Sequence, residues 1–389
     1  MTGVYYANPI SDKGIQLFCS QYQRVEQMDK AEVVLVRSKN LIETDFGDSL
    51  LAIARAGAGV NNIPLGKCAE QGIVVFNTPG ANANAVKELV IASMIMAARN
   101  VCAGMAWVKD LTGDNIAEQV EKGKSSFAGH EISGKTLGVI GLGAIGVLVA
   151  NAANSLGMRV LGYDPYISVQ AAWKLSRSVT PETDLEHLYE QADFITLHLP
   201  LLPATEKMLN AEAFARMKDG VILLNYARDL LVDEAALKEA LSSGKVAQYM
   251  SDFPNAQIAN TEKIQLMPHI GASTAESEEN CAVMAVQQIM DFIENGNIKN
   301  SVNFPDCDMG KASCIRICVL HRNIPNMIGK LAGFLGAHGC NIANMVNKSR
   351  KEYAYSMFDM DNEISEELMA ELKKVEGILR VRIIRPGCS

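Results

Sequence analysis

Short apolar runs alternate with longer, alanine-rich segments along most of the chain. The runs predict β-strands over 32–38, 50–56, 72–78, 135–141, 158–164, 192–200, 220–227 and 245–253. Several of them are apolar on both faces, which is typical of parallel strands covered by helices on both sides. Segments with helical periodicity lie between the strands, at 83–100, 145–156 and 234–244. This alternation predicts an α/β architecture with doubly wound parallel sheets.

The pattern changes after a long helix predicted over 276–296, which Ser273 or Thr274 would cap. The polar segment that follows contains Pro and Gly without periodicity and is interpreted as a linker. Beyond it we predict strand, helix, two strands, helix and strand, over 313–321, 327–339, 341–350, 352–361, 365–377 and 378–385. The order βαββαβ is the ferredoxin-like plan.

Composition narrows the class of protein. The chain has 389 residues, of which 48% are hydrophobic and 21% charged, as expected for a soluble globular protein of two or three domains. A formal net charge of −8 without a basic run disfavours nucleic-acid binding. No apolar stretch is long enough for a bilayer, and the first residues do not resemble a signal peptide. Nine scattered cysteines predict reduced thiols in the cytoplasm, and their spacing gives no reason to expect a metal.

A glycine-rich turn is the most specific motif. Gly141, Gly143 and Gly146 form GxGxxG between a predicted strand and a predicted helix. In this context the glycines permit a tight turn, the approach of a pyrophosphate and close helix–strand packing. Asp164 ends the next strand, where a carboxylate accepts ribose hydroxyls and repels a 2′-phosphate, so NAD is favoured over NADP. The alternative is a Rossmann-like turn that binds no nucleotide.

Five segments together resemble one known family. They are similar to motifs of the D-isomer-specific 2-hydroxyacid dehydrogenases and stand in that family's order. The segments are FAGHEISGKTLGVIGLGAIG with GMRVLGYDP, LLNYARDLLVDEAAL, LMPHIGAST, RAGAGVNNIP and VFNTPGANANAVKELV. The resemblance covers residues 1 to 305. The last segment, with HRNIPNMIGKLAGFLGAHGCNIANM, resembles an ACT domain, a small regulatory module that binds amino acids.

The resemblance implies two catalytic residues. His269 would act as general acid and base, and Arg228 would polarise the substrate carbonyl and hold its carboxylate. Without the resemblance, the simpler interpretations would be that His269 is a structural histidine and that Arg228 forms a surface ion pair. The chain departs from the family twice: Asp229 stands where Gly is usual, and the glutamate that pairs with the histidine is absent. Gln257 occupies its place by count, and Glu262 is the nearest carboxylate.

A histidine without a carboxylate partner has a lower pKa than a paired one. We therefore expect the acidic limb of the oxidation-rate profile to lie at lower pH than in relatives that have the pair. If Glu262 replaces the missing partner, the limb would stay high and would fall in Glu262→Gln.

The resemblance also implies a set of cofactor contacts around the glycine turn. Besides the three glycines and Asp164 they are Ala144, Ile145, Tyr163, Thr78, His198, Pro200, Ala227 and Asp252, the last at the nicotinamide end.

Substrate contacts are implied at the ends of two predicted strands. Arg37 and Arg55 match positions that hold a substrate phosphate, and the backbone of Gly57, Ala58 and Gly59 would receive a carboxylate. The alternative is a pair of solvated surface arginines. Lys122 and Lys124 could reach the phosphate site of a neighbouring subunit, since this stretch lies near the dimer contact in relatives.

In the segment similar to an ACT domain, the resemblance implies effector contacts at His321, Asn323 and Asn341, with L-serine as effector. Asn326 stands after Pro325 where ACT domains usually have Gly, which bears on the loop geometry. The alternative is an ACT domain used only for assembly.

A dehydrogenase followed by an ACT domain is the arrangement of the branch that begins serine synthesis. The expected reaction is therefore NAD-dependent oxidation of 3-phosphoglycerate to 3-phosphohydroxypyruvate by a homodimer or homotetramer. The alternatives are reduction of hydroxypyruvate or glyoxylate, and an NADH-sensing interaction protein. We expect a discontinuous substrate-binding domain over 1–95 and 272–303, with an NAD-binding domain over 96–271 between its two parts. A linker over 304–312 and an ACT domain over 313–389 would follow.

Overall fold

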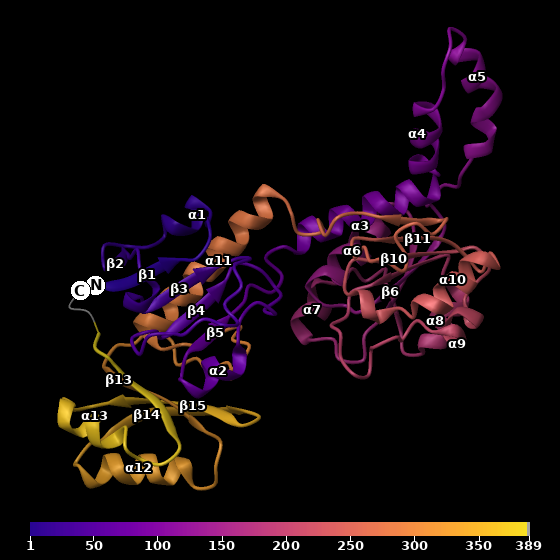
Figure 1. The fold of residues 1–389 in the computed structure, drawn as a ribbon. Coiled ribbons are helices and arrows are strands. Elements are labelled where there is room, and N and C mark those ends of the chain that lie inside the picture. Colours follow the sequence, from indigo (N-terminus) through magenta and orange to yellow (C-terminus); the bar gives the residue numbers. More distant parts are fainter. Residues whose placement is uncertain (387–389) are drawn as a thin grey trace. The chain divides into compact units, whose positions relative to one another are not determined.

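The computed structural model describes residues 1–386, which form two compact units (Figure 1). Unit 1 combines residues 1–82 with the described residues from 275 onward, and unit 2 comprises residues 83–274. The chain therefore leaves unit 1 once, builds unit 2 and returns. The boundaries at 95/96 and 271/272 stay predictions, whereas the contacts divide the chain at 82/83 and 274/275.

Unit 1 contains a five-stranded parallel sheet in the order β2-β1-β3-β4-β5. Its elements are β1 (Thr2–Tyr6), α1 (Asp12–Ile15), β2 (Tyr22–Arg24), η1 (Met28–Lys30), β3 (Val33–Val36), β4 (Ala52–Arg55), α2 (Leu65–Glu70) and β5 (Val74–Phe76). The strands predicted from apolar runs are confirmed as β3, β4 and β5. The pattern missed β1 and β2, because both are short and carry polar or tyrosine residues.

One long helix, α11 (Ala275–Asn295), brings the chain back into unit 1. Its buried positions recur at helical spacing, as in Cys281, Ala285, Ile289 and Phe292, which confirms the predicted helix. It begins directly after Thr274, one of the two predicted capping residues.

A four-stranded antiparallel sheet follows, in the order β14-β15-β13-β16. The elements are β13 (Ile315–Arg322), α12 (Met327–Ala337), β14 (Ile342–Arg350), β15 (Tyr353–Met360), α13 (Glu366–Leu372) and β16 (Ile378–Ile384). The predicted βαββαβ order is confirmed, and we call this part the C-terminal domain. One face of its sheet packs on α12 and α13, through residues such as Val319 and Leu331. The other face shares a core with α11 and the first sheet, through Leu320, Tyr355 and Met357.

Unit 2 contains a seven-stranded parallel sheet in the order β12-β11-β10-β9-β6-β7-β8 (Figure 1). The strands are β6 (Thr136–Ile140), β7 (Arg159–Tyr163), β8 (Thr180–Glu182), β9 (Phe194–Leu197), β10 (Val221–Asn225), β11 (Val246–Ser251) and β12 (Ile264–Leu266). The helices are α3 (Ala83–Ala98), α4 (Val101–Lys109), α5 (Ile116–Gly123), η2 (Lys124–Phe127), α6 (Ala144–Ser155), α7 (Val169–Lys174), α8 (Leu185–Gln191), α9 (Ala211–Arg216), η3 (Asp229–Leu231) and α10 (Glu234–Ser242). The predicted doubly wound α/β fold is confirmed.

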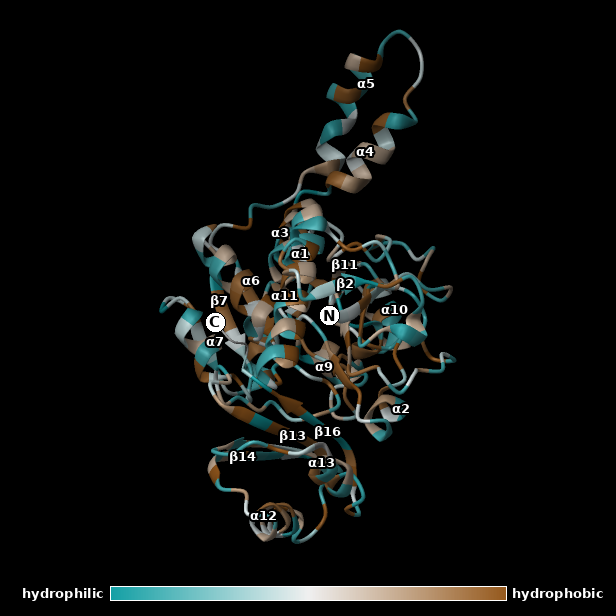
Figure 2. Cartoon of the chain, turned by 90° about the vertical axis from the view of Figure 1, so that its left-hand side faces the viewer, coloured by the Kyte–Doolittle hydropathy of each residue, from teal (hydrophilic) through white to brown (hydrophobic). Residues whose placement is uncertain are grey.

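Five α-helices of unit 2 were not predicted, namely α4, α5, α7, α8 and α9. Helices α4 and α5 form a hairpin that projects from α3, away from the sheet (Figure 2). No single helix within residues 1–386 is long and apolar enough to cross a membrane; α3 and α4 together meet that test by length and composition only, with a bend of 67° between them.

Candidate functional site

The residues implied as the cofactor and catalytic set of unit 2 follow the carboxyl ends of its parallel strands. They are Gly141 after β6, Asp164 after β7, His198 after β9, Arg228 after β10, Asp252 after β11 and His269 after β12. Parallel strands end at the same edge of a sheet, so these residues share one edge. The strand order reverses between β6 and β9, and α/β proteins place their ligands at such a point.

The glycine turn has the shape that a dinucleotide requires. A Cβ on Gly146 would lie 1.9 Å from the carbonyl oxygen of Gly141, and one on Gly141 would lie 2.5 Å from the carbonyl oxygen of His198. Gly143, by contrast, faces open space. It stands before α6 without a side-chain cap, so the first amides of this helix remain available to a phosphate. The residues present therefore fit an NAD pyrophosphate, with Ala144 and Ile145 in the first turn of α6.

Asp164 is fixed directly beside this turn. One carboxylate oxygen accepts a hydrogen bond from the Leu142 amide at 2.8 Å, and the other accepts one from the Tyr166 amide at 2.9 Å. The carbonyl of Tyr163 accepts from the Gly141 amide at 2.8 Å. A carboxylate has about four acceptor sites, so Asp164 can still bind ribose hydroxyls.

His198 lies beside the first glycine of the turn, and the exposed Pro200 follows two residues later. Its Nε2 is 3.0 Å from the Thr196 hydroxyl, whereas its Nδ1 is shielded from solvent and has no partner in the described chain. Burial lowers the pKa of His198 to about 3, so the imidazole is neutral. An unpartnered buried nitrogen beside the turn is consistent with a ligand that completes the site.

The loop that carries Arg228 is held by a residue that the sequence did not single out. Asn225 is fully buried; its side chain accepts from the Ala227 amide at 3.2 Å and donates to the Arg228 carbonyl at 2.8 Å. It also donates to the Tyr249 hydroxyl at 3.1 Å. Ala227 is buried, whereas Arg228 is exposed and its guanidinium bonds to the Ala227 carbonyl. Asp229 is exposed as the first residue of η3.

Asp252 connects to the loop that carries His269. Its Oδ2 accepts from the Gly271 amide at 2.8 Å, while its Oδ1 is buried and without a partner in the described chain. Burial raises the pKa of Asp252, and the neighbouring amides and the charge of His269 oppose that effect. The unpartnered oxygen fits the carboxamide of a nicotinamide, which supplies a hydrogen-bond donor. His269 is exposed, and its ring contacts Phe253 with centroids 4.8 Å apart.

Neither proposed partner of the histidine is bonded to it. Gln257 and Glu262 are both exposed, and within residues 1–386 no hydrogen bond or ion pair joins either of them to His269. The carboxylate whose charge interacts with His269 is that of Asp252. A role for Gln257 or Glu262 stays a prediction.

In unit 1, the implied substrate residues are brought together at the carboxyl ends of β3, β4 and β5. Arg55 donates through Nε to the Arg37 carbonyl at 2.9 Å and through Nη1 to the Gly59 carbonyl. A Cβ on Gly59 would lie 2.8 Å from this Nη1, so a side chain there would displace the end of the Arg55 side chain. The Gly57 amide donates to the Thr78 hydroxyl at 2.8 Å.

This arrangement leaves part of the loop available for an anion. The Gly57 amide is occupied, but those of Ala58 and Gly59 donate to no group within the described residues. Thr78, implied as a cofactor contact, is fully buried in unit 1 and holds the Gly57 end of this loop. Its cofactor role stays a prediction.

The three implied effector residues do not meet within one chain. His321 is buried, with Nδ1 bonded to the Arg322 carbonyl at 2.8 Å and Nε2 to the Ser356 hydroxyl at 2.9 Å. Asn323 donates to the Lys351 carbonyl beyond the same end of the sheet. Asn341 precedes β14 at the opposite end, because Ile342 pairs with Met360 whereas His321 pairs with Ala354.

The replacement of Gly by Asn at position 326 preserves the backbone conformation. Asn326 has φ 61°, in the left-handed region. Asn is the residue that tolerates this region best after Gly. The departure therefore leaves the turn into α12 intact.

Comparison with known proteins identifies the family. The chain is 31% identical to the D-3-phosphoglycerate dehydrogenase of Haemophilus influenzae, over 86% of this chain and 81% of the relative. The chain belongs to the D-isomer-specific 2-hydroxyacid dehydrogenase family. Residues 91–271 match the NAD-binding domain of D-isomer-specific 2-hydroxyacid dehydrogenases. That region includes the glycine turn, Arg228 and His269.

Two further relatives agree with the assignment. The chain is 35% identical to the D-3-phosphoglycerate dehydrogenase of Methanocaldococcus jannaschii over 79% of its own length, but it spans 58% of that relative. A crystal structure of NAD+-bound 3-phosphoglycerate dehydrogenase from Entamoeba histolytica is 29% identical, with a TM-score of 0.61, and covers 78% of this chain and 98% of that one. NAD is accordingly the cofactor of this chain.

Proposed function

We propose that this protein oxidises 3-phosphoglycerate to 3-phosphohydroxypyruvate with NAD. The observation that carries the proposal is the pair Arg37 and Arg55 beside a loop with available amides at Ala58 and Gly59. Two guanidinium groups suit a phosphate, and the amides suit a carboxylate. A 2-hydroxy acid without a phosphate has no need of both arginines. The relatives named above carry the same activity in their names.

The roles of the residues in unit 2 follow from their chemistry. The glycine turn and Asp164 would hold NAD, which would supply the acceptor for the hydride of the hydroxyl-bearing carbon. His269 takes the hydroxyl proton through a ring nitrogen, and in reduction it returns that proton. Arg228 holds the substrate carboxylate and stabilises negative charge on the reacting oxygen. Asp252 positions the His269 loop through the Gly271 amide.

We include L-serine as an inhibitor acting on the C-terminal domain. Strand β14 is an edge strand and is largely exposed, so it can pair with the β14 of a second copy. Antiparallel pairing would place Asn341 of one copy near the His321 end of the other, because the two residues lie at opposite ends of the sheet. Asn side chains there can both donate to and accept from an amino acid.

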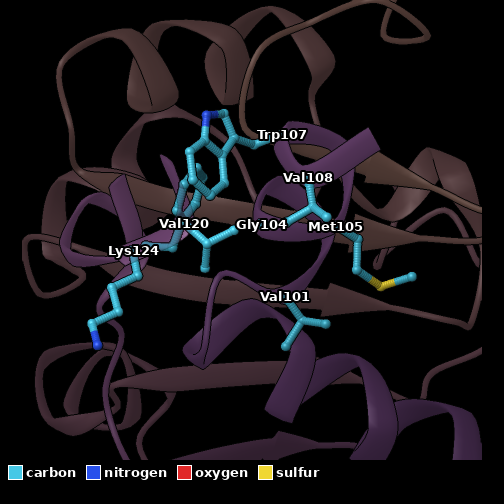
Figure 3. A pocket seen from close by; sticks show the side chains of 8 residues that line it. Val101, Gly104, Met105, Trp107, Val108, Val120 and Lys124 are labelled. Atoms are coloured by element: carbon cyan, nitrogen blue, oxygen red, sulfur yellow. The ribbon is translucent and has the colours of Figure 1, made fainter. Parts of the chain in front are cut away.

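The assembly in this proposal is a homodimer or a homotetramer. The α4–α5 hairpin supports it, because the hairpin exposes Met105 and Val108 and lines an open apolar pocket of about 540 Å³ (Figure 3). Its lining residues are Val101, Gly104, Met105, Trp107, Val108, Val120, Lys124 and Phe127. A second copy would cover this surface.

A role for Lys122 and Lys124 in the substrate site of a neighbouring subunit has less support. Lys122 forms an ion pair with Glu118 at 2.6 Å, and Lys124 forms one with Glu121. Both lysines are exposed on the hairpin and are paired with carboxylates nearby in the sequence.

The test is NADH oxidation with 3-phosphohydroxypyruvate, with hydroxypyruvate as control, each with and without L-serine. Strong preference for the phosphorylated substrate supports the proposed reaction, and inhibition by serine supports the effector. Equal rates on both substrates would instead indicate a general 2-hydroxyacid dehydrogenase. NADH binding without turnover of any 2-oxo acid would indicate an NADH-sensing protein.

A further inference from the structure

A carboxylate from the returning helix contacts one of the two arginines implied in phosphate binding. Glu278 lies in the first turn of α11, and its Oε1 is 2.5 Å from Nη2 of Arg37. The two residues are 241 positions apart in the sequence. Both side chains are about half exposed, at 44% for Arg37 and 43% for Glu278. The ion pair is therefore open to water and to small ions.

The backbone of Arg37 is fixed, so only its side chain can exchange partners. The side-chain oxygen of Asn8 accepts the amides of Arg37, Ser38 and Lys39 at 3.0, 3.1 and 3.0 Å. The Arg37 carbonyl accepts from Nε of Arg55. With both backbone groups bonded, the guanidinium can move between Glu278 and another anion without disturbing the strand end.

The first turns of α11 face both arginines. Cys281, three residues after Glu278, is buried, and the charges of Arg37 and Arg55 both act on its thiol. Thr78, which holds the Gly57 amide, also contacts Cys281. Arg37, Arg55, Glu278 and Cys281 therefore lie together at this end of the sheet, and Lys39 follows Arg37 there.

We propose that Glu278 is a built-in counter-ion that competes with the phosphate of the substrate for Arg37. This inference rests on the function proposed above. The carboxylate of Glu278 offsets the charge of the Arg37 guanidinium, whereas a phosphate dianion can draw Arg37 away from Glu278. An unphosphorylated 2-oxo acid has no group with which to do so. Glu278 therefore lowers the affinity of the site for phosphorylated ligands and for free phosphate alike.

Glu278→Gln tests the inference, with Glu279→Gln as a matched control. Glu279 is the next residue of α11 and pairs with Lys13 at 2.5 Å, so both variants remove one carboxylate from the same helix turn. We expect Glu278→Gln to lower KM for 3-phosphohydroxypyruvate about two- to fivefold, the range for one exposed ion pair. KM for hydroxypyruvate should not change, and Glu279→Gln should resemble wild type with both substrates.

Inorganic phosphate gives a second measurement. As a competitor of 3-phosphohydroxypyruvate it should bind about two- to fivefold more tightly to Glu278→Gln, and this difference should shrink as ionic strength rises. Glu278→Gln should have no further effect on KM in an Arg37→Met background, because the pair is already broken.

Three results would overturn the inference: equal changes in the two glutamine variants, an equal change with both substrates, or an effect of Glu278→Gln that persists without Arg37. Failure of the proposed function is distinguishable, because wild type would then show no preference for 3-phosphohydroxypyruvate. In that case phosphate binding to the two variants, measured by calorimetry, still decides the role of Glu278.

Discussion

Asp252 combines burial with incomplete bonding. It is 1% exposed, one oxygen accepts the Gly271 amide, and the other has no partner in the described chain. Burial raises its pKa because the charged form loses hydration. Such a residue lowers the stability of the free protein, but it can accept a hydrogen bond from a ligand. This combination is expected of a functional site.

Asp252→Asn should make the free protein more stable at neutral pH and less active. The folded pKa is raised above the unfolded value of about 3.9, so the stability contributed by Asp252 is complete below that value and is lost as pH rises through the folded pKa. Asparagine keeps the acceptor for Gly271 without the buried charge. Thermal melts should show a higher Tm than wild type at pH 8, with the difference disappearing near pH 4.

Turnover in Asp252→Asn should fall at every pH. For the thermal melts, the reference is wild type measured at both pH values. A lower Tm than wild type at pH 8 would contradict the prediction. That result would show that the charged form gains more from the Gly271 amide than it loses by burial.

At the scale of elements, α11 ends against the C-terminal domain, which supplies the partners of its last carbonyls. Arg316 donates to the Asn295 carbonyl at 2.7 Å, and Arg382 donates to the Ile293 carbonyl at 3.0 Å. The Tyr355 hydroxyl donates to the Gly296 carbonyl at 2.7 Å. A helix leaves its last carbonyls without partners and carries partial negative charge there, so two arginines stabilise this end.

Arg316→Met should destabilise unit 1 strongly. The Arg316 side chain is 1% exposed and forms a bidentate pair with Asp359. Removing one partner of a buried pair leaves an uncompensated charge and costs about 3–5 kcal/mol. Urea unfolding should show this loss, and Arg316→Met with Asp359→Asn should recover part of it. A double variant as unstable as the single one would assign the loss to the α11 carbonyls instead.

At the scale of the whole molecule, the hydrophobic cores show which elements pack together into one unit. A single core joins the first sheet, α11 and the C-terminal domain through Phe76, Phe292 and Tyr355, whereas unit 2 has cores of its own. The α4–α5 hairpin contributes no buried residue to any of them. Its exposed apolar residues therefore have another use, which we propose is contact with a second copy.

Met105→Lys should weaken the proposed assembly of two copies. Met105 is 60% exposed on the hairpin, and a lysine would place a charge in an apolar interface. Light scattering should show a shift to lower mass at a given concentration. Val169→Lys is the control, because Val169 is 73% exposed on α7, outside the hairpin. An equal shift in both variants, or in neither, would contradict the hairpin interface.

The sequence by itself determined the parts that depend on neighbours along the chain. Apolar runs predicted the central strands of both parallel sheets, and helical spacing predicted α11. The glycine turn with Asp164 predicted a nucleotide site because the turn, the helix and the next strand are consecutive. The resemblance then supplied Arg228 and His269, which no local pattern distinguishes from a surface arginine and a structural histidine.

The tertiary structure decided what depends on contacts between distant segments. Three such contacts join residues that share no local sequence pattern. They are the hydrogen bond of Asn225 to Tyr249, the hydrogen bond of Gly271 to Asp252 and the ion pair of Arg37 with Glu278. The short strands β1 and β2 form because neighbouring strands offer hydrogen-bond partners, not because of their own periodicity. Burial and pairing are properties of the folded packing, so they appear only when segments far apart in sequence meet.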